Sequence, residues 1–132
     1  MSAVIYWFSR HSPLPAQRRA LNELFPDSEI AQDENVFDDA KDIVSRFGSL
    51  NLSEVQVVII APLSLVARLL DYGVHPLWPE MEPVGKYYAM THLDECVSAP
   101  RGRWFRFVRF RRLMRIEMKF EEINYADRSH SS

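Results

Sequence analysis

The sequence predicts an α/β fold in which a parallel sheet is flanked by helices. Two apolar runs rich in β-branched and aromatic residues, 3–8 and 55–61, are short and typical of strands covered on both faces. Amphipathic stretches of helical period separate such runs. Strands that alternate with helices pair in parallel, because each helix carries the chain back across one face of the sheet.

In the first half of the chain we expect a strand at 3–8, a helix that begins at Pro13 or Pro15 and ends at Phe25, a strand at 29–32 and a helix at 36–47. Proline is favoured in a first helical turn, which places the start of the first helix. Pro26 stops that helix. The apolar residues of 36–47 recur at spacings of three and four, and Gly48 is placed to end the helix they form.

In the second half we expect a strand at 55–61, a helix at 64–72, a strand at 75–78, a loop at 79–86, a fifth strand at 87–91, a turn at 99–102 and a long strand at 108–121. Pro62 and Gly73 bound the helix. Apolar and charged residues alternate along 108–121, and its length predicts a bend near Arg111-Arg112. The fold class is therefore a small Rossmann-like parallel sheet flanked by helices, with an antiparallel, β-rich C-terminal extension.

The length of 132 residues fits a single domain, placed at 1–123, with a disordered tail at 124–132. No apolar run reaches the roughly 18 residues that a membrane span needs. No secretion signal precedes the first strand. We therefore expect a cytoplasmic protein with no membrane partner. The single Cys96 excludes an internal disulfide, and we expect neither a metal nor a cofactor.

The net charge of −2 hides two blocks of opposite sign. Residues 1–98 contain seven Lys and Arg against fourteen Asp and Glu, a net charge of −7, and residues 99–132 contain nine against four, a net charge of +5. Arginines and aromatic residues are interleaved in 101–119, RGRWFRFVRFRRLMRIEMK. This pattern suits single-stranded nucleic acid. The commoner explanation of such alternation is a half-exposed edge strand that arginine keeps soluble.

Polar residues follow two of the predicted strands at the sheet edge where parallel α/β proteins bind ligands. Ser9–Ser12 comes directly after the first strand, and Ala61–Ser64 comes directly after the strand at 55–61. Arg10 can pair with a phosphate through a fork of donors, and His11 can move a proton near neutral pH. The serines also have a structural reading as helix caps. Together these residues predict an anion or nucleotide site.

Three stretches carry a resemblance to a known family. Ser9-Arg10-His11 precedes a helix start that reads Pro15-Ala16-Gln17, residues 57–79 read VVIIAPLSLVARLLDYGVHPLWP, and residues 105–111 read FRFVRFR. Together they resemble small Rossmann-like proteins of CRISPR loci and mobile elements, some of which are ring nucleases that bind and cut cyclic oligoadenylate. The resemblance implies a homodimer with a two-fold site over the carboxyl ends of the strands. It also implies that a ribose 2′-hydroxyl attacks the adjacent phosphate without a metal.

The leading hypothesis is a small dimeric Rossmann-like protein that binds cyclic or linear oligoadenylate, and cleavage of the ligand by a ring nuclease-like reaction is left open. Arg10 would hold a phosphate and stabilise developing charge, and His11 would act as general acid or orient the 2′-hydroxyl. Ser9 and Ser64, with nearby backbone amides, would fix the phosphates. The expected ligand-binding residues are Ser12, Gln17, Pro62, Leu63, Ser64, Arg106, Arg109 and Arg111. The acidic segment 33–42 and the lack of a second histidine at the site leave binding without cleavage open.

Two other hypotheses rest on the basic segment 101–119. The first is a non-enzymatic protein that binds single-stranded nucleic acid through this segment. The second is purely structural: the basic strand pairs with its copy in a dimer, or faces the acidic helix at 38–46.

Overall fold

The computed structural model describes residues 4–35, 39–48, 50–51 and 54–124. Its strands are β1 (Val4–Phe8), β2 (Glu29–Asp33), β3 (Gln56–Ile59), β4 (Leu77–Val84), β5 (Cys96–Ala99) and β6 (Arg103–Arg112). Its α-helices are α1 (Pro15–Leu24), α2 (Ala40–Val44), α3 (Leu63–Asp71) and α4 (Lys86–Thr91), and two 3₁₀ turns lie at Ser45–Phe47 and Pro100–Gly102. The predicted tail lies outside the described residues from Tyr125 onward.

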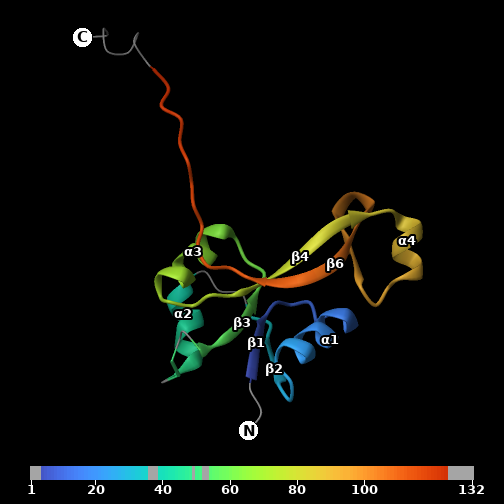
Figure 1. Ribbon diagram of the computed structural model, residues 1–132, viewed down its shortest axis with the longest axis horizontal. Coiled ribbons are helices and arrows are strands. Elements are labelled where there is room, and N and C mark those ends of the chain that lie inside the picture. Colours follow the sequence, from blue (N-terminus) through green and yellow to red (C-terminus); the bar gives the residue numbers. More distant parts are fainter. Residues whose placement is uncertain (1–3, 36–38, 49, 52–53, 125–132) are drawn as a thin grey trace.

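The strands form one mixed sheet in the order β2-β1-β3-β4-β6-β5. β2, β1, β3 and β4 are parallel neighbours, whereas β6 runs antiparallel to both β4 and β5. The expected α/β class and the antiparallel C-terminal strands are confirmed. The sheet as a whole is mixed rather than parallel, and the pairing of β3 with β4 is limited to Val58 and Leu77. In Figure 1, β4 and β6 extend past that contact into a lobe that carries α4.

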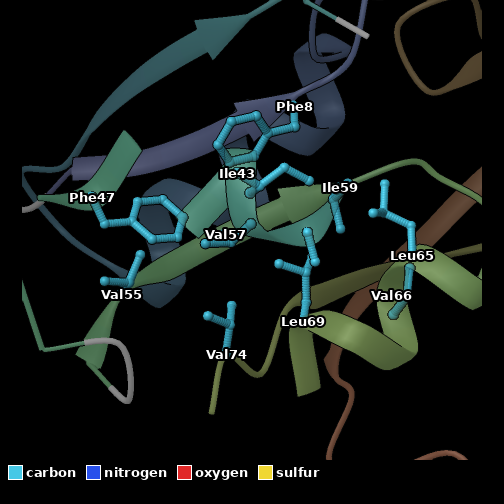
Figure 2. Close-up of a cluster of buried hydrophobic side chains, with 11 residues drawn as sticks. Phe8, Ile43, Phe47, Val55, Val57, Ile59, Leu65, Val66, Leu69 and Val74 are labelled. Atoms are coloured by element: carbon cyan, nitrogen blue, oxygen red, sulfur yellow. The ribbon is translucent and has the colours of Figure 1, made fainter. Parts of the chain in front are cut away.

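Helices cover both faces of the parallel part of the sheet. On one face, side chains of β1 and β3 pack with α2, the following 3₁₀ turn and α3; Figure 2 shows the side chains of this cluster, among them Phe8, Ile43 and Leu69, converging between the elements. On the other face, Leu21 of α1 packs against Ile5, Trp7 and Leu77. β1 is therefore buried from both sides, as its continuous apolar sequence predicted.

The first helix begins at Pro15, one of the two prolines predicted to start it, and the Gln17 side chain stabilises this start. The Gln17 side chain is buried, and its Oε1 accepts a hydrogen bond from the Leu14 backbone N–H at 2.8 Å. The Ala16 N–H donates to the Asp94 carbonyl at 3.1 Å. Proline has no N–H, so the donors at the start of α1 are largely satisfied within the protein.

Two predicted elements in the middle of the chain are wrong. Residues 79–84 lie inside β4 although Pro79 and Pro83 favour a loop, because β4 pairs with β6 along its whole length. Residues 87–91 lie in α4 rather than in a strand. The short β5 was not predicted. Short local patterns do not separate the alternatives here. An apolar pair such as Tyr87-Tyr88 occurs in helices as well as in strands, and whether a segment forms a strand depends on the strand beside it.

The helix predicted at 36–47 is shorter than expected in the described residues. Asp39 is extended and caps the helix by accepting from the Lys41 N–H at 2.9 Å, so α2 begins at Ala40. Residues 36–38 lie outside the described part of the chain. Gly48 has a φ of 60°, which suits its predicted place at the helix end.

The strand predicted at 108–121 is also different. β6 spans Arg103–Arg112, and residues 113–124 continue as extended chain with neither helix nor strand. A bulge opposite Glu80 and Met81 shifts the register, which leaves Val108 without a partner. Phe107 and Phe110 therefore share the inner side while Val108 is exposed, and the alternation expected around Val108 is broken.

The core predicts which substitutions will destabilise the fold. Ile43 is fully buried between α2 and the sheet, so Ile43→Ala leaves a cavity and should lower the free energy of unfolding by about 2–5 kcal/mol. Leu24→Ala on the exposed side of α1 is the control, with an expected change within about 0.5 kcal/mol. Urea unfolding followed by far-UV circular dichroism measures both, and equal losses would contradict this assignment of the core.

Candidate functional site

The chain turns sharply after β1, and three hydrogen bonds hold this turn. The buried indole of Trp7 donates to the His11 carbonyl at 2.8 Å. The Gln32 side-chain amide of β2 donates to the Ser9 carbonyl at 3.0 Å, and the Ser9 hydroxyl accepts from the His11 N–H at 3.1 Å. The backbone of Ser9–His11 is therefore fixed from β1 and β2, and the side chain of Arg10 points to solvent.

This turn and the end of β3 face one cleft. The cleft has a volume of about 260 Å³, and its lining residues come from three segments: Phe8, Ser9, Arg10, His11, Asn35, Ile59, Ile60, Ala61, Pro62 and Leu65. The two polar corners predicted to lie side by side do so, because β1 and β3 are parallel neighbours and their carboxyl ends meet at the same edge. Within the described residues, no carboxylate lines this cleft.

The cleft offers donors that the protein itself leaves unused. Arg10 and His11 are exposed, and neither side chain makes an ion pair or hydrogen bond within the described residues. Pro62 is the N-cap of α3 and supplies no side-chain hydrogen bond. The N–H groups of Leu65 and Val66 bond the Pro62 carbonyl, whereas those of Leu63 and Ser64 have no partner in the described part of the chain. An anion at this end of α3 would satisfy them.

The carboxylates of the acidic segment line other cavities and not this cleft, as far as the structure describes them. Asp33 and Glu34 line a neighbouring cavity of about 600 Å³ together with Arg46, and Arg46 pairs with Asp33 at 3.5 Å. Asp39 lines another cavity of about 560 Å³ next to α3. The carboxylates that would repel a polyanion therefore face other cavities than the one that Arg10 lines, which weakens their effect on a ligand at Arg10.

Several predicted site residues lie elsewhere. Ser64 lines the cavity beside α2 and α3 rather than the cleft of Arg10, although Leu65 borders both. Ser12 donates to the Gln32 side chain at 3.3 Å, and Gln17 is occupied as the helix cap described above. Leu63 is exposed at the start of α3 and lines the cavity that also contains Trp78 and Arg111.

Sequence reasoning missed Asn35 and Ile60. Asn35 follows β2, and the same rule that placed the other two corners at one edge would have placed it there as well. Ile60 follows β3 and is 58% exposed, which makes it an apolar side chain at the mouth of the cleft.

Two of the five arginines of β6 are paired with glutamates of β4. Arg106 pairs with Glu82, and Arg109 pairs with Glu80 at 2.6 Å. The Glu82 carboxylate raises the pKa of the Arg106 guanidinium through its hydrogen bond. Arg112 donates to the His75 carbonyl at 3.0 Å and to Gln56 at 2.7 Å. Arg111 makes no ion pair within the described residues and lines a cavity with Trp78 and Leu63.

Other features of the described chain restrict what the site can be. No three His, Cys, Asp or Glu side chains of the described residues come together as a metal site. In the same part of the chain, no helix is long and apolar enough to cross a membrane. Comparison of the chain with protein-family models, curated proteins and solved structures finds no match.

The cross-strand pairs predict how nucleic-acid binding can be switched on. Replacing Glu80 and Glu82 with glutamine frees Arg109 and Arg106, so the variant should elute from heparin at a clearly higher salt concentration. The matched control is Glu121→Gln/Glu122→Gln, which changes the net charge equally but frees no arginine in the described part of the chain. Equal shifts for the two variants would mean that net charge alone governs retention.

Proposed function

We propose that the protein binds a short adenylate oligonucleotide, cyclic or linear, in the cleft between the carboxyl ends of β1 and β3. The observation that carries the proposal is a cleft lined by the exposed Arg10, whose side chain makes no ion pair or hydrogen bond within the described residues, and by no described carboxylate. Pro62, the N-cap of α3, lines the same cleft, and the N–H groups of Leu63 and Ser64 that follow it have no partner in the described part of the chain. Arginine gives a phosphodiester two parallel donors, and helix N-terminal amides add a second set. A neutral ligand would make no use of either.

The topology supports a ligand at this place. The parallel strands of the mixed sheet lie in the order β2-β1-β3-β4 with helices on both faces, and the strand order reverses between β1 and β3. The connections from β1 and β3 leave this point toward opposite faces. The crevice outside their carboxyl ends is the usual ligand site of such sheets, and Arg10 lies beside it.

The apolar part of the cleft suits a base. Phe8, Ile59 and Leu65 form a buried floor, and the exposed Ile60 lies at the mouth. A planar base covers such a surface, while Asn35 offers both a donor and an acceptor to a base edge. The choice of adenine among the bases rests on the resemblance of the Ser9-Arg10-His11 turn to that of cyclic-oligoadenylate-binding proteins.

The same cleft supports one cleavage chemistry. The ribose 2′-oxygen attacks the adjacent phosphorus and loses its proton to water, and the bond from phosphorus to the 5′-oxygen breaks. The His11 imidazolium gives its proton to the leaving 5′-oxygen, and Arg10 stabilises the charge on the phosphoryl oxygens. The products are a 2′,3′-cyclic phosphate and a 5′-hydroxyl. The fixed backbone at His11 holds the base of this side chain in place.

Binding of nucleic acid through the basic strand has weaker support. Arg106 and Arg109 carry the charge that this hypothesis needs, and both are compensated by β4. Only exposed arginines such as Arg111 remain for a phosphate on that strand.

Substitution of Arg10 tests the proposed site. Arg10→Ala should weaken binding of cyclic tetra- or hexa-adenylate by roughly 10- to 100-fold, because one charge-assisted contact to phosphate is lost. Arg111→Ala is the control and should leave the affinity unchanged. Isothermal titration calorimetry on both variants gives the comparison. A loss with Arg111→Ala alone would favour the basic strand, and no binding by the wild-type protein would refute the proposal.

Substitution of His11 separates cleavage from binding. His11→Ala should slow the release of products with a 2′,3′-cyclic phosphate by about 100-fold, while the dissociation constant changes little. Chromatography of labelled cyclic oligoadenylate after incubation measures product release by the wild-type protein and by the His11→Ala variant. If the wild-type protein binds the ligand and releases no product, binding stands and the cleavage step is wrong.

A further inference from the structure

The C-terminal arm, defined here as residues 113–124, is extended chain that belongs to no strand. Its large apolar side chains are exposed: Met114 by 60%, Met118 by 77%, Phe120 by 85% and Ile123 by 64%. Single exposed apolar residues are ordinary on a protein surface, but four within one extended segment are not. Such a concentration of exposed apolar side chains indicates that the arm contacts another surface.

The arm is anchored only at its beginning. The Leu113 N–H donates to the Pro76 carbonyl at 2.9 Å, and Leu113 and Ile116 pack against the core cluster under α3. Beyond Ile116, the backbone makes no hydrogen bond with the described residues. Figure 1 shows the arm leaving beside α3 and running away from the sheet, on the side opposite β2. From residue 117 to residue 124, the backbone donors and acceptors of the arm therefore have no partner among the described residues.

The arm has the pattern of a strand. Met114, Ile116, Met118 and Phe120 alternate with Arg115, Glu117, Lys119 and Glu121. In an extended chain this places the apolar residues on one side and the charged residues on the other. A segment with this alternation and an unpaired backbone can form main-chain hydrogen bonds by adding as a strand to the open edge of a sheet.

β2 is such an edge. It is the first strand in the sheet order and pairs with β1 along all five of its residues, so its other side has no strand neighbour in the described chain. Glu29, Ala31 and Asp33 share one face of β2, and Ile30 lies on the other face against the cluster of Trp7 and Leu21. The opposite edge strand, β5, reads CVSA and offers no charge.

We propose that the arm of one copy pairs with the free edge of β2 in a second copy, and that the exchange is reciprocal. The charges match: Arg115 and Lys119 are four residues apart on one side of the arm, and Glu29 and Asp33 are four residues apart on one face of β2. This match holds whether the arm runs parallel or antiparallel to β2. Cross-strand pairs of opposite charge then form on one face.

The other face of the arm fits as well. When Arg115 and Lys119 face Glu29 and Asp33, Met118 and Phe120 lie on the face of Ile30. That face of the sheet also carries Phe25, which is partly buried at the margin of the same cluster as Ile30. The exposed side chains of the arm would thus be covered by apolar surface of the partner.

We assign the contact to a second copy of the same chain, because each chain carries both the arm and the free edge of β2. Two copies that exchange arms form a closed two-fold dimer with two identical contacts, which leaves no free arm and no free β2 edge. The inference does not depend on the proposed function, since neither Arg10 nor the cleft takes part.

Sedimentation of the full-length protein, with charge reversals on both sides of the contact, tests the proposal. The wild-type protein should be a dimer. Glu29→Lys and Lys119→Glu should each raise the dimer dissociation constant by roughly tenfold or more, because like charges then meet in both contacts. Combining Glu29→Lys with Lys119→Glu should restore the dimer if the strands are antiparallel, and combining it with Arg115→Glu should do so if they are parallel. Circular dichroism confirms that each variant is folded.

The controls separate the remaining possibilities. Met118→Asp/Phe120→Asp should give a folded monomer, whereas Leu93→Asp, on an exposed residue after α4, should leave the dimer intact. A monomeric wild-type protein overturns the proposal, as does a dimer that survives the arm substitutions. A dimer that the arm substitutions dissociate but Glu29→Lys does not would mean that the arms pair with each other, and it would overturn the assignment to β2.

Discussion

The indole of Trp7 is the constraint on which the candidate site depends. Trp7 lies at the end of a strand that is buried on both faces, and its ring N–H needs an acceptor inside the protein. The His11 carbonyl supplies it, so the chain must turn back directly after Phe8. This turn directs Arg10 and His11 outward at the edge where β3 also ends. A core requirement thus determines where the polar residues of the site lie.

The opposite charges of residues 1–98 and 99–132 are partly compensated within the fold. Each of these two blocks contributes one strand to the β4–β6 pair, and the glutamates of β4 face arginines of β6 across it. These pairs are partly exposed and contribute little stability, but they set the register and keep the strand soluble. The bulge at Val108 is compatible with these pairs. It places both Phe107 and Phe110 on the inner side of the strand, while Arg106 stays opposite Glu82 and Arg109 stays opposite Glu80.

The sequence predicted the parallel half of the fold well and the antiparallel half poorly. β1 and β3, which were predicted at 3–8 and 55–61, have buried side chains on both faces, and the composition of these segments alone identifies them as strands. The site corners followed from the rule that parallel strands end at one edge. In contrast, Pro79 lies in a strand because β4 pairs with β6, which no local pattern reveals, and Tyr87 lies in a helix rather than in the predicted strand. Gln17 was expected to bind a ligand, but a buried amide beside an uncapped helix start satisfies the backbone first.

β2 connects the two surfaces that the structure leaves open. From its inner side, Gln32 donates to the Ser9 carbonyl and accepts from Ser12, so β2 helps to fix the turn that carries Arg10. Its outer side is the edge to which we assign the partner's arm. A strand paired on both sides is more rigid than an edge strand, because each backbone group then has a partner. Docking of the arm would therefore hold Gln32 more firmly, and the turn at Arg10 would lose less conformational entropy when a ligand binds. In this arrangement the dimer contact and the cleft are coupled through one side chain, without a contact between the arm and the ligand.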